Sequence, residues 1–160
     1  MEEVPGRPHE TEKERLDRNL NELLGGLRVA LPGIQVLFAF LLILPFQGRF
    51  AEATPFQEKV FFVALIATAL SSVLLIAVPV RHRLLFRRDQ KQYVVFAGSN
   101  LAVAGLALLG VAILAAILLV SDFLFGALTA AIATGGIAVA IGWIWFAAPL
   151  LRRTRNRARD

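Results

Sequence analysis

The chain has 160 residues, of which 57% are hydrophobic, with a mean hydropathy of +0.65 and a formal net charge of +5. Soluble domains contain roughly 45–50% apolar residues, so this composition excludes an ordinary soluble domain and predicts an integral membrane protein. The chain contains no cysteine, which excludes disulfides, thiolate nucleophiles and cysteine-ligated metals.

Two segments precede the apolar part of the chain. Residues 1–10 contain two prolines, one glycine and three glutamates, and we expect them to form a disordered tail. Residues 11–28 are predicted to form an amphipathic juxtamembrane helix, because leucines recur at helical spacing between Leu16 and Leu27. The leucine face fits either the inner bilayer surface or a partner helix, including one from a second copy.

Four apolar blocks then form a transmembrane domain over residues 29–150, followed by a basic tail over residues 151–160. A spanning helix needs about 20 mostly apolar residues, and four blocks meet or approach that length: 29–46, 57–80, 94–120 and 124–149. The predicted fold is therefore an all-α integral membrane protein, with four transmembrane helices in an antiparallel bundle preceded by the amphipathic helix. Thr54 and Gln57 fit a capping box at the start of the second span, and Asp122 is predicted to cap the fourth.

The basic residues predict how the chain is oriented, because lysine and arginine collect in cytoplasmic loops. Residues 7–28, 81–91 and 152–159 carry five basic residues each, which is fifteen of the seventeen in the chain. This distribution predicts a multi-pass protein of the inner (plasma) membrane with both termini in the cytoplasm. The inner loop could also contact anionic lipid headgroups, although orientation alone explains its charge; its arginines are Arg81, Arg83, Arg87 and Arg88. Because the positive charge is confined to these membrane flanks, nucleic acid is not expected as a partner.

Small residues in the spans indicate how the helices pack. Lipid tails are as apolar as leucine, so helix association is favoured by close backbone approach at small residues. Stripes of small residues occur at heptad-like spacing on the third and fourth spans, and include Gly98, Ala102, Gly105, Ala131, Thr134 and Ala138. We predict that these two stripes pack against each other in a tight antiparallel hairpin.

Side chains that could carry chemistry are scarce inside the blocks. No Asp, Glu, Lys, Arg or His lies within residues 29–46, 60–80, 94–120 or 124–149, whereas ion-coupled transporters place ionisable groups in the membrane. Gln35 and Asn100 lie at comparable depth, and we predict a hydrogen bond between them, with a small polar cavity as the alternative role. No catalytic, cofactor-binding or metal-binding residue is predicted, and we expect no enzymatic activity.

Three features of the sequence together resemble a known family. They are the charged opening helix, the stretches RVALPG and QVLFAF at the start of the first span, and the basic inner loop. Over roughly residues 11–150 the chain resembles a family of small, uncharacterised bacterial four-span membrane proteins, classed as a domain of unknown function. Some relatives carry the label sodium/proton antiporter, which the resemblance alone implies.

Three functions therefore compete. The first is a non-enzymatic bundle that binds a partner or associates with itself. The second is an oligomeric small transporter, such as a sodium/proton antiporter, although Gln35 in the first span cannot titrate. An integral membrane enzyme comes third.

Overall fold

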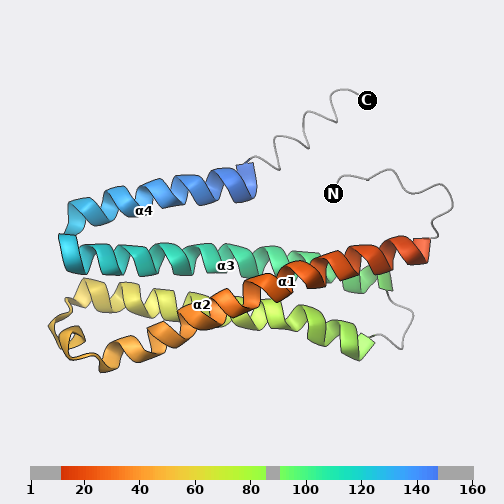
Figure 1. Ribbon diagram of the computed structural model, residues 1–160, viewed down its shortest axis with the longest axis horizontal. Coiled ribbons are helices and arrows are strands. Elements are labelled where there is room, and N and C mark those ends of the chain that lie inside the picture. The colour runs from red at the N-terminus through yellow and green to blue at the C-terminus, as the bar shows by residue number, and fades with distance from the viewer. Residues whose placement is uncertain (1–11, 86–90, 148–160) are drawn as a thin grey trace.

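The structure is a computed structural model that describes residues 12–85 and 91–147 of the chain. Within those ranges the protein is all-α, and it contains four long helices, each with a stretch long and apolar enough to cross a membrane. They are α1 (Glu12–Ile43), α2 (Pro55–Leu85), α3 (Lys91–Phe125) and α4 (Ala127–Ile141) (Figure 1). The span of α4 includes part of the π-helical turn that follows it and runs from Ala127 to Trp145. The predicted fold class is confirmed, and the chain is a multi-pass membrane protein. The predicted tails over residues 1–10 and 151–160 lie outside the described residues.

The connections at one end of the molecule are short. Two 3₁₀ turns, η1 (Leu44–Phe46) and η2 (Gly48–Glu52), join α1 to α2, and α4 continues into a π-helical turn, η3 (Gly142–Ala147). At the start of α2 the Thr54 N–H donates to Gln57 Oε1 over 3.0 Å, and the Gln57 N–H donates to Thr54 Oγ1 over 3.3 Å. The predicted capping box is therefore confirmed.

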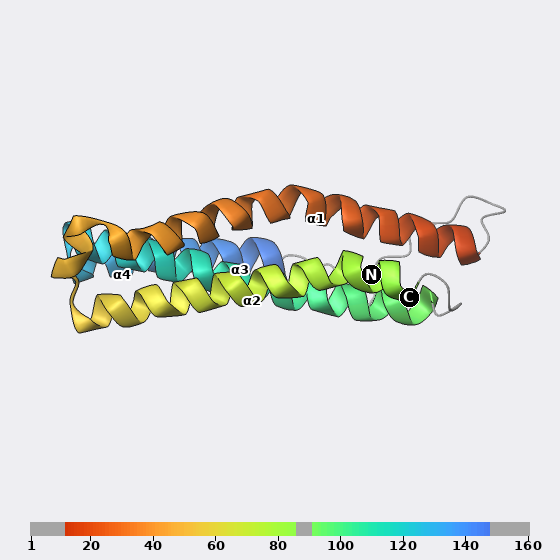
Figure 2. The same cartoon turned by 90° about the horizontal axis from the view of Figure 1, so that it is seen from below.

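The first helix is longer than a single span. The sequence predicts an amphipathic helix over residues 11–28 that runs or bends directly into a span over residues 29–46. In the structure α1 continues through Gly25, Gly26 and Pro32 without a break. The first turns of α1 extend past the ends of α2 and α3, and the helix is bowed along its length (Figure 2). The amphipathic segment is thus a continuation of the first span.

The turn between α3 and α4 corrects the prediction for Asp122. That residue belongs to the last turn of α3, and its backbone carbonyl accepts a hydrogen bond from the Gly126 N–H over 3.0 Å. The N-cap of α4 is Gly126, with φ 82° and ψ 172° and no side-chain cap. So tight a reversal needs a positive φ, which glycine adopts without steric cost, so the helix breaks at the glycine and not at the aspartate.

The helices α1, α2 and α3 share the buried core, and α4 packs outside it against α3. The larger buried cluster joins residues of α1, α2 and α3: Leu27, Ile34, Leu75, Val78 and Ala102. In Figures 1 and 2, α1 crosses the paired α2 and α3, while α4 runs beside α3. Among the described residues, α4 contacts no long helix other than α3.

The small-residue stripe of α3 packs on a different helix from the one predicted. Gly98, Ala102 and Gly105 are buried, but a Cβ placed on Gly105 would lie 2.6 Å from Leu75 Cγ of α2. The close neighbour at Gly105 is therefore α2 and not α4, because a stripe of small residues permits close approach by any neighbour.

The predicted stripe of α4 is also displaced. Ala131 is exposed, Thr134 and Ala138 are partly buried, and Ala130 is the fully buried residue of this helix. One residue of displacement turns a helical side chain by about 100°. The face of α4 toward α3 is therefore rotated from the predicted one, although the antiparallel hairpin itself is present.

Candidate functional site

The polar side chains between α2 and α3 are bonded to backbone within the chain. The Ser71 hydroxyl donates to the Gly105 carbonyl across the interface over 2.7 Å. Within α2 the Thr68 hydroxyl donates to the Ala64 carbonyl over 2.7 Å and the Ser72 hydroxyl to the Thr68 carbonyl over 2.9 Å. A hydroxyl bonded to a carbonyl of its own or a neighbouring helix is satisfied without water. Of these groups, only Ser71 joins α2 to α3.

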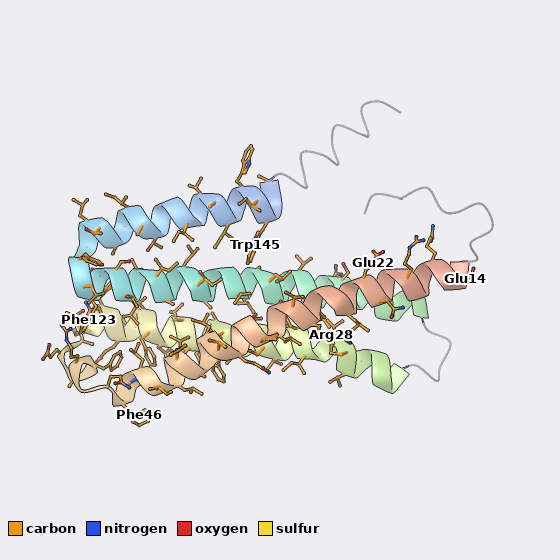
Figure 3. All side chains as sticks on the ribbon, in the orientation of Figure 1. Glu14, Glu22, Arg28, Phe46, Phe123 and Trp145 are labelled. Atoms are coloured by element: carbon orange, nitrogen blue, oxygen red, sulfur yellow. The ribbon has the colours of Figure 1, made fainter. Side chains whose placement is uncertain are left out.

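A second polar group, the turn-end cluster of Arg49, Gln57, Asp122 and Phe123, lies where η2, the start of α2 and the end of α3 meet. Gln57 is 7% exposed, and its Nε2 donates to Asp122 Oδ2 over 2.8 Å. The Arg49 guanidinium carbon lies 5.4 Å from the centroid of the Phe123 ring, within cation–π range. Figure 3 shows Phe123 and Phe46 at this same end of the molecule.

The geometry of the turn-end cluster is that of a clamp. Gln57 uses its oxygen for the Thr54 N–H and its amide nitrogen for Asp122, so it joins the cap of α2 to the last turn of α3. The nearby edge-to-face pair of Phe50 and Phe61, with centroids 5.1 Å apart, fixes η2 against α2. The sequence reasoning missed the bond between Gln57 and Asp122. The signal available was that both residues fall at the same end of neighbouring antiparallel spans.

Gln35 and Asn100, the predicted polar pair, are not brought together. Both side chains are exposed, and no hydrogen bond within the described residues joins them. Ile34, which is 1% exposed, takes the inward position of α1. A neighbouring position on a helix lies about 100° around the axis, so Gln35 faces away from the core and the predicted interhelical bond is not formed.

The described residues were compared with what a metal ion or an anionic lipid headgroup requires. Over residues 12–85 and 91–147, no group of three His, Asp or Glu side chains gathers where it could hold a metal ion. Arg81 is exposed near the end of α2. The side chain of Arg83 and the whole of Arg87 and Arg88 lie outside what the structure describes, so their contact with lipid headgroups stays a prediction.

The outward surfaces of α1 and α4 are the remaining candidates for an interaction site. Of the residues in each membrane-crossing window, 33% are buried in α2 and 28% in α3, against 11% in α1 and 6% in α4. Lipid tails are as apolar as leucine, so outward apolar side chains such as Val29 and Leu128 need no protein partner. A polar side chain in the same position does require one. Exposed Ser99, Asn100 and Thr129 lie within two residues of an end of their spans, whereas Gln35 lies eleven residues from either end of its own. Gln35 is therefore the candidate functional residue of the spans.

A family model described as a family of unknown function (DUF6328) matches residues 9–149. No curated protein and no solved structure matches the chain.

Proposed function

Because the chain belongs to this family of unknown function (DUF6328), we propose a function from its own residues: a non-enzymatic membrane bundle that associates with other membrane helices through α1. We place it in the inner (plasma) membrane with both termini in the cytoplasm, because fifteen of its seventeen basic residues fall in three segments that a four-span topology would put on one side. The alternative role, an oligomeric sodium/proton antiporter, is weighed against it below.

The observation that carries this proposal is the outward position of Gln35. Its carboxamide has two donors and an acceptor oxygen, and hydrocarbon offers a partner to none of them. The other polar groups in the spans that the structure shows bonded, such as Ser71 and Thr68, have acceptors inside the chain. An amide that the chain leaves exposed in lipid is satisfied when a further helix supplies the hydrogen bonds.

Two features weigh against ion exchange. The spans contain no titratable side chain between residues 29 and 46 or between residues 60 and 80, whereas ion-coupled transporters use such groups as carriers. Asp122 is a carboxylate near the end of a span, and its side chain accepts a hydrogen bond from Gln57 of α2. A clamp that joins two helix ends does not provide a path across the membrane.

The proposal is tested by photocrosslinking in membranes. A photoreactive amino acid replaces Ala39, which is exposed one turn from Gln35 on α1, and in a matched variant it replaces Val73, which is exposed on α2. We expect a protein adduct of defined mass from position 39 and lipid adducts alone from position 73. Lipid adducts alone from position 39 would contradict association through α1.

The antiporter alternative is tested in parallel with purified protein in liposomes. A pH-sensitive dye inside the vesicles reports proton movement after a sodium gradient is imposed. We expect the same trace as in protein-free vesicles. Sodium-dependent proton movement above that level would replace the proposed function with transport.

A further inference from the structure

Gln35 lies at the centre of its span. The membrane-crossing part of α1 runs from Leu24 to Phe46, so Gln35 is eleven residues from either end. At 1.5 Å per residue this is about 16 Å, which is half of a hydrocarbon core of about 30 Å. A side chain at this depth is too short to reach water from either surface. Its hydrogen bonds must come from protein.

Gln35 is also part of a continuous exposed stripe, which we call the Gln35 stripe. Its six residues follow spacings of three and four and are all exposed: Gly25, Arg28, Pro32, Gln35, Ala39 and Leu42. This rhythm is the one by which two helices pair with a left-handed crossing. Figure 2 shows α1 along the outside of the molecule, with its outer side free of the other helices.

Two further features of the stripe fit a close helix neighbour. A Cβ added to Gly25 would meet nothing within 4 Å, so another helix can approach the backbone of α1 there. Pro32 has no N–H, and the Arg28 carbonyl four residues before it therefore lacks its usual helical donor. In membranes such freed backbone groups are satisfied in part by neighbouring helices. Both features lie on the same side of α1 as Gln35.

We propose that the helix seated on the Gln35 stripe is α1 of a second copy of this chain. This inference rests on the proposed function, since it names the partner of the same surface. Copies inserted in one membrane have the same orientation, so a two-fold axis along the membrane normal places the two Gln35 side chains at equal depth. The carboxamide is self-complementary, and each amide group donates to the oxygen of the other. A different protein would need its own polar group at that depth.

Arg28 is the residue of the stripe that opposes pairing. It lies only four residues inside the end of the span at Leu24, and its side chain is exposed. Long arginine side chains extend to the interface and keep the guanidinium in water. The two charges of a dimer therefore separate at the membrane surface, while the carboxamides meet in its centre.

The test measures association of the full-length chain in vesicles of phosphatidylethanolamine and phosphatidylglycerol. The chain has no native cysteine, so Ala158→Cys accepts a donor or acceptor dye for energy transfer. We expect transfer that saturates with a dimer stoichiometry as the protein-to-lipid ratio rises. Gln35→Leu should lower the association constant by about tenfold, and Gln35→Asn, which keeps the amide, should retain most of it. The matched control is Asn100→Leu, which removes an exposed amide on α3 and should leave transfer unchanged.

A second measurement reports which face is in contact. Ala39→Cys should form an intermolecular disulfide under mild oxidation, whereas Ala107→Cys, exposed on α3, should not. Circular dichroism of Gln35→Leu should match the unchanged chain, because an exposed side chain does not support the fold. A wild-type chain that stays monomeric at all ratios, or a dimer unaffected by Gln35→Leu, would overturn the inference.

The outcomes also separate this inference from the proposed function. A monomer by energy transfer, together with a heterologous protein adduct at position 39, overturns the second copy and leaves association with a different partner. Lipid adducts alone at position 39 overturn both. A dimer that also moves protons with sodium supports the Gln35 contact and overturns the non-transport role.

Discussion

The two faces of α3 are packed to different tightness, and a glycine on each face shows it. A Cβ on Gly105 would lie 2.6 Å from Leu75 Cγ and 2.7 Å from Leu75 Cδ2 of α2. A Cβ on Gly110 would lie 3.6 Å from Ile141 Cγ2 of α4, which is an ordinary van der Waals distance. The α2 face therefore needs its glycine, whereas the α4 face would accept a methyl group.

The difference shows that α3 packs more closely against α2 than against α4. The α2–α3 contact combines backbone approach at Gly105, the Ser71 hydrogen bond and the clamp between Gln57 and Asp122. On the α4 side, the hydroxyl of Thr134 is buried without a hydrogen-bond partner in the described chain, so packing there is not supported by polar contacts of this kind.

The largest effect is expected from Gly105→Leu. The added side chain cannot fit beside Leu75, which is fully buried, so the free energy of unfolding should fall by about 3 kcal/mol, the upper part of the usual overpacking range. The measurement is SDS titration of the protein in mild detergent, followed by circular dichroism.

Gly110→Ala is the matched control for that variant, and it should be neutral or stabilising by up to about 1 kcal/mol, because alanine favours a helix over glycine. Combining Gly105→Leu with Leu75→Ala should recover part of the loss, because the smaller neighbour makes room. Equal effects of the Gly105 and Gly110 variants would remove the difference between the two faces.

Gln57→Glu tests the clamp at the end of the close pair. The new carboxylate keeps the acceptor for the Thr54 N–H but loses the donor to Asp122 and faces a like charge, so we expect a loss of about 1–2 kcal/mol. Thermal unfolding in detergent should show a lower midpoint. Glu58→Gln, a change at the neighbouring exposed position, is the control and should have little effect. Equal midpoints for the two variants would show that the clamp does not stabilise the α2–α3 pair.

Ser71→Ala removes the hydrogen bond between the helices of the pair. Such bonds contribute about 0.6 kcal/mol on average and at most about 1.7 kcal/mol in a membrane protein, and the loss should fall in that range by SDS titration. Ser72→Ala is a close control, because the Ser72 hydroxyl bonds to its own helix. If Ser72→Ala costs as much as Ser71→Ala, the bond to the Gly105 carbonyl has no special role in joining α2 to α3.

The sequence predicts the spans well because length and hydropathy alone determine them. The boundaries at Thr54 and Gln57 were predictable, since a capping box is a local signal that depends on residues three apart. The partner of Gly105 was not predictable, because a small residue indicates close approach without indicating which helix approaches. Asp122 was misassigned for a related reason: its local cap propensity is real, but Gly126 alone permits the backbone reversal.

The candidate site was predictable only in part. The apolar blocks contain no ionisable group, which the sequence shows directly, and this absence made the polar residue Gln35 a candidate. Which way Gln35 points depends on the rotation of α1, and that rotation is set by Ile34 and Leu41 packing into separate clusters against α2 and α3. One residue of difference decides between an internal hydrogen bond and an outward amide, and hydrophobic periodicity is weak in a helix that is apolar on every side.

The smallest effect, and one of opposite sign, is expected from Thr134→Val on the α4 side. Valine keeps the shape of threonine but removes the buried hydroxyl that has no partner, and a buried polar group without a hydrogen bond costs free energy. The free energy of unfolding should therefore stay equal or rise by about 0.5 kcal/mol, measured by SDS titration beside Ser71→Ala. Opposite signs for these two hydroxyl deletions would show that the two faces of α3 differ in hydrogen bonding as well as in distance. A loss of stability in Thr134→Val would instead mean that the hydroxyl bonds to a group outside the described chain, and α4 would then be a second interaction surface beside α1.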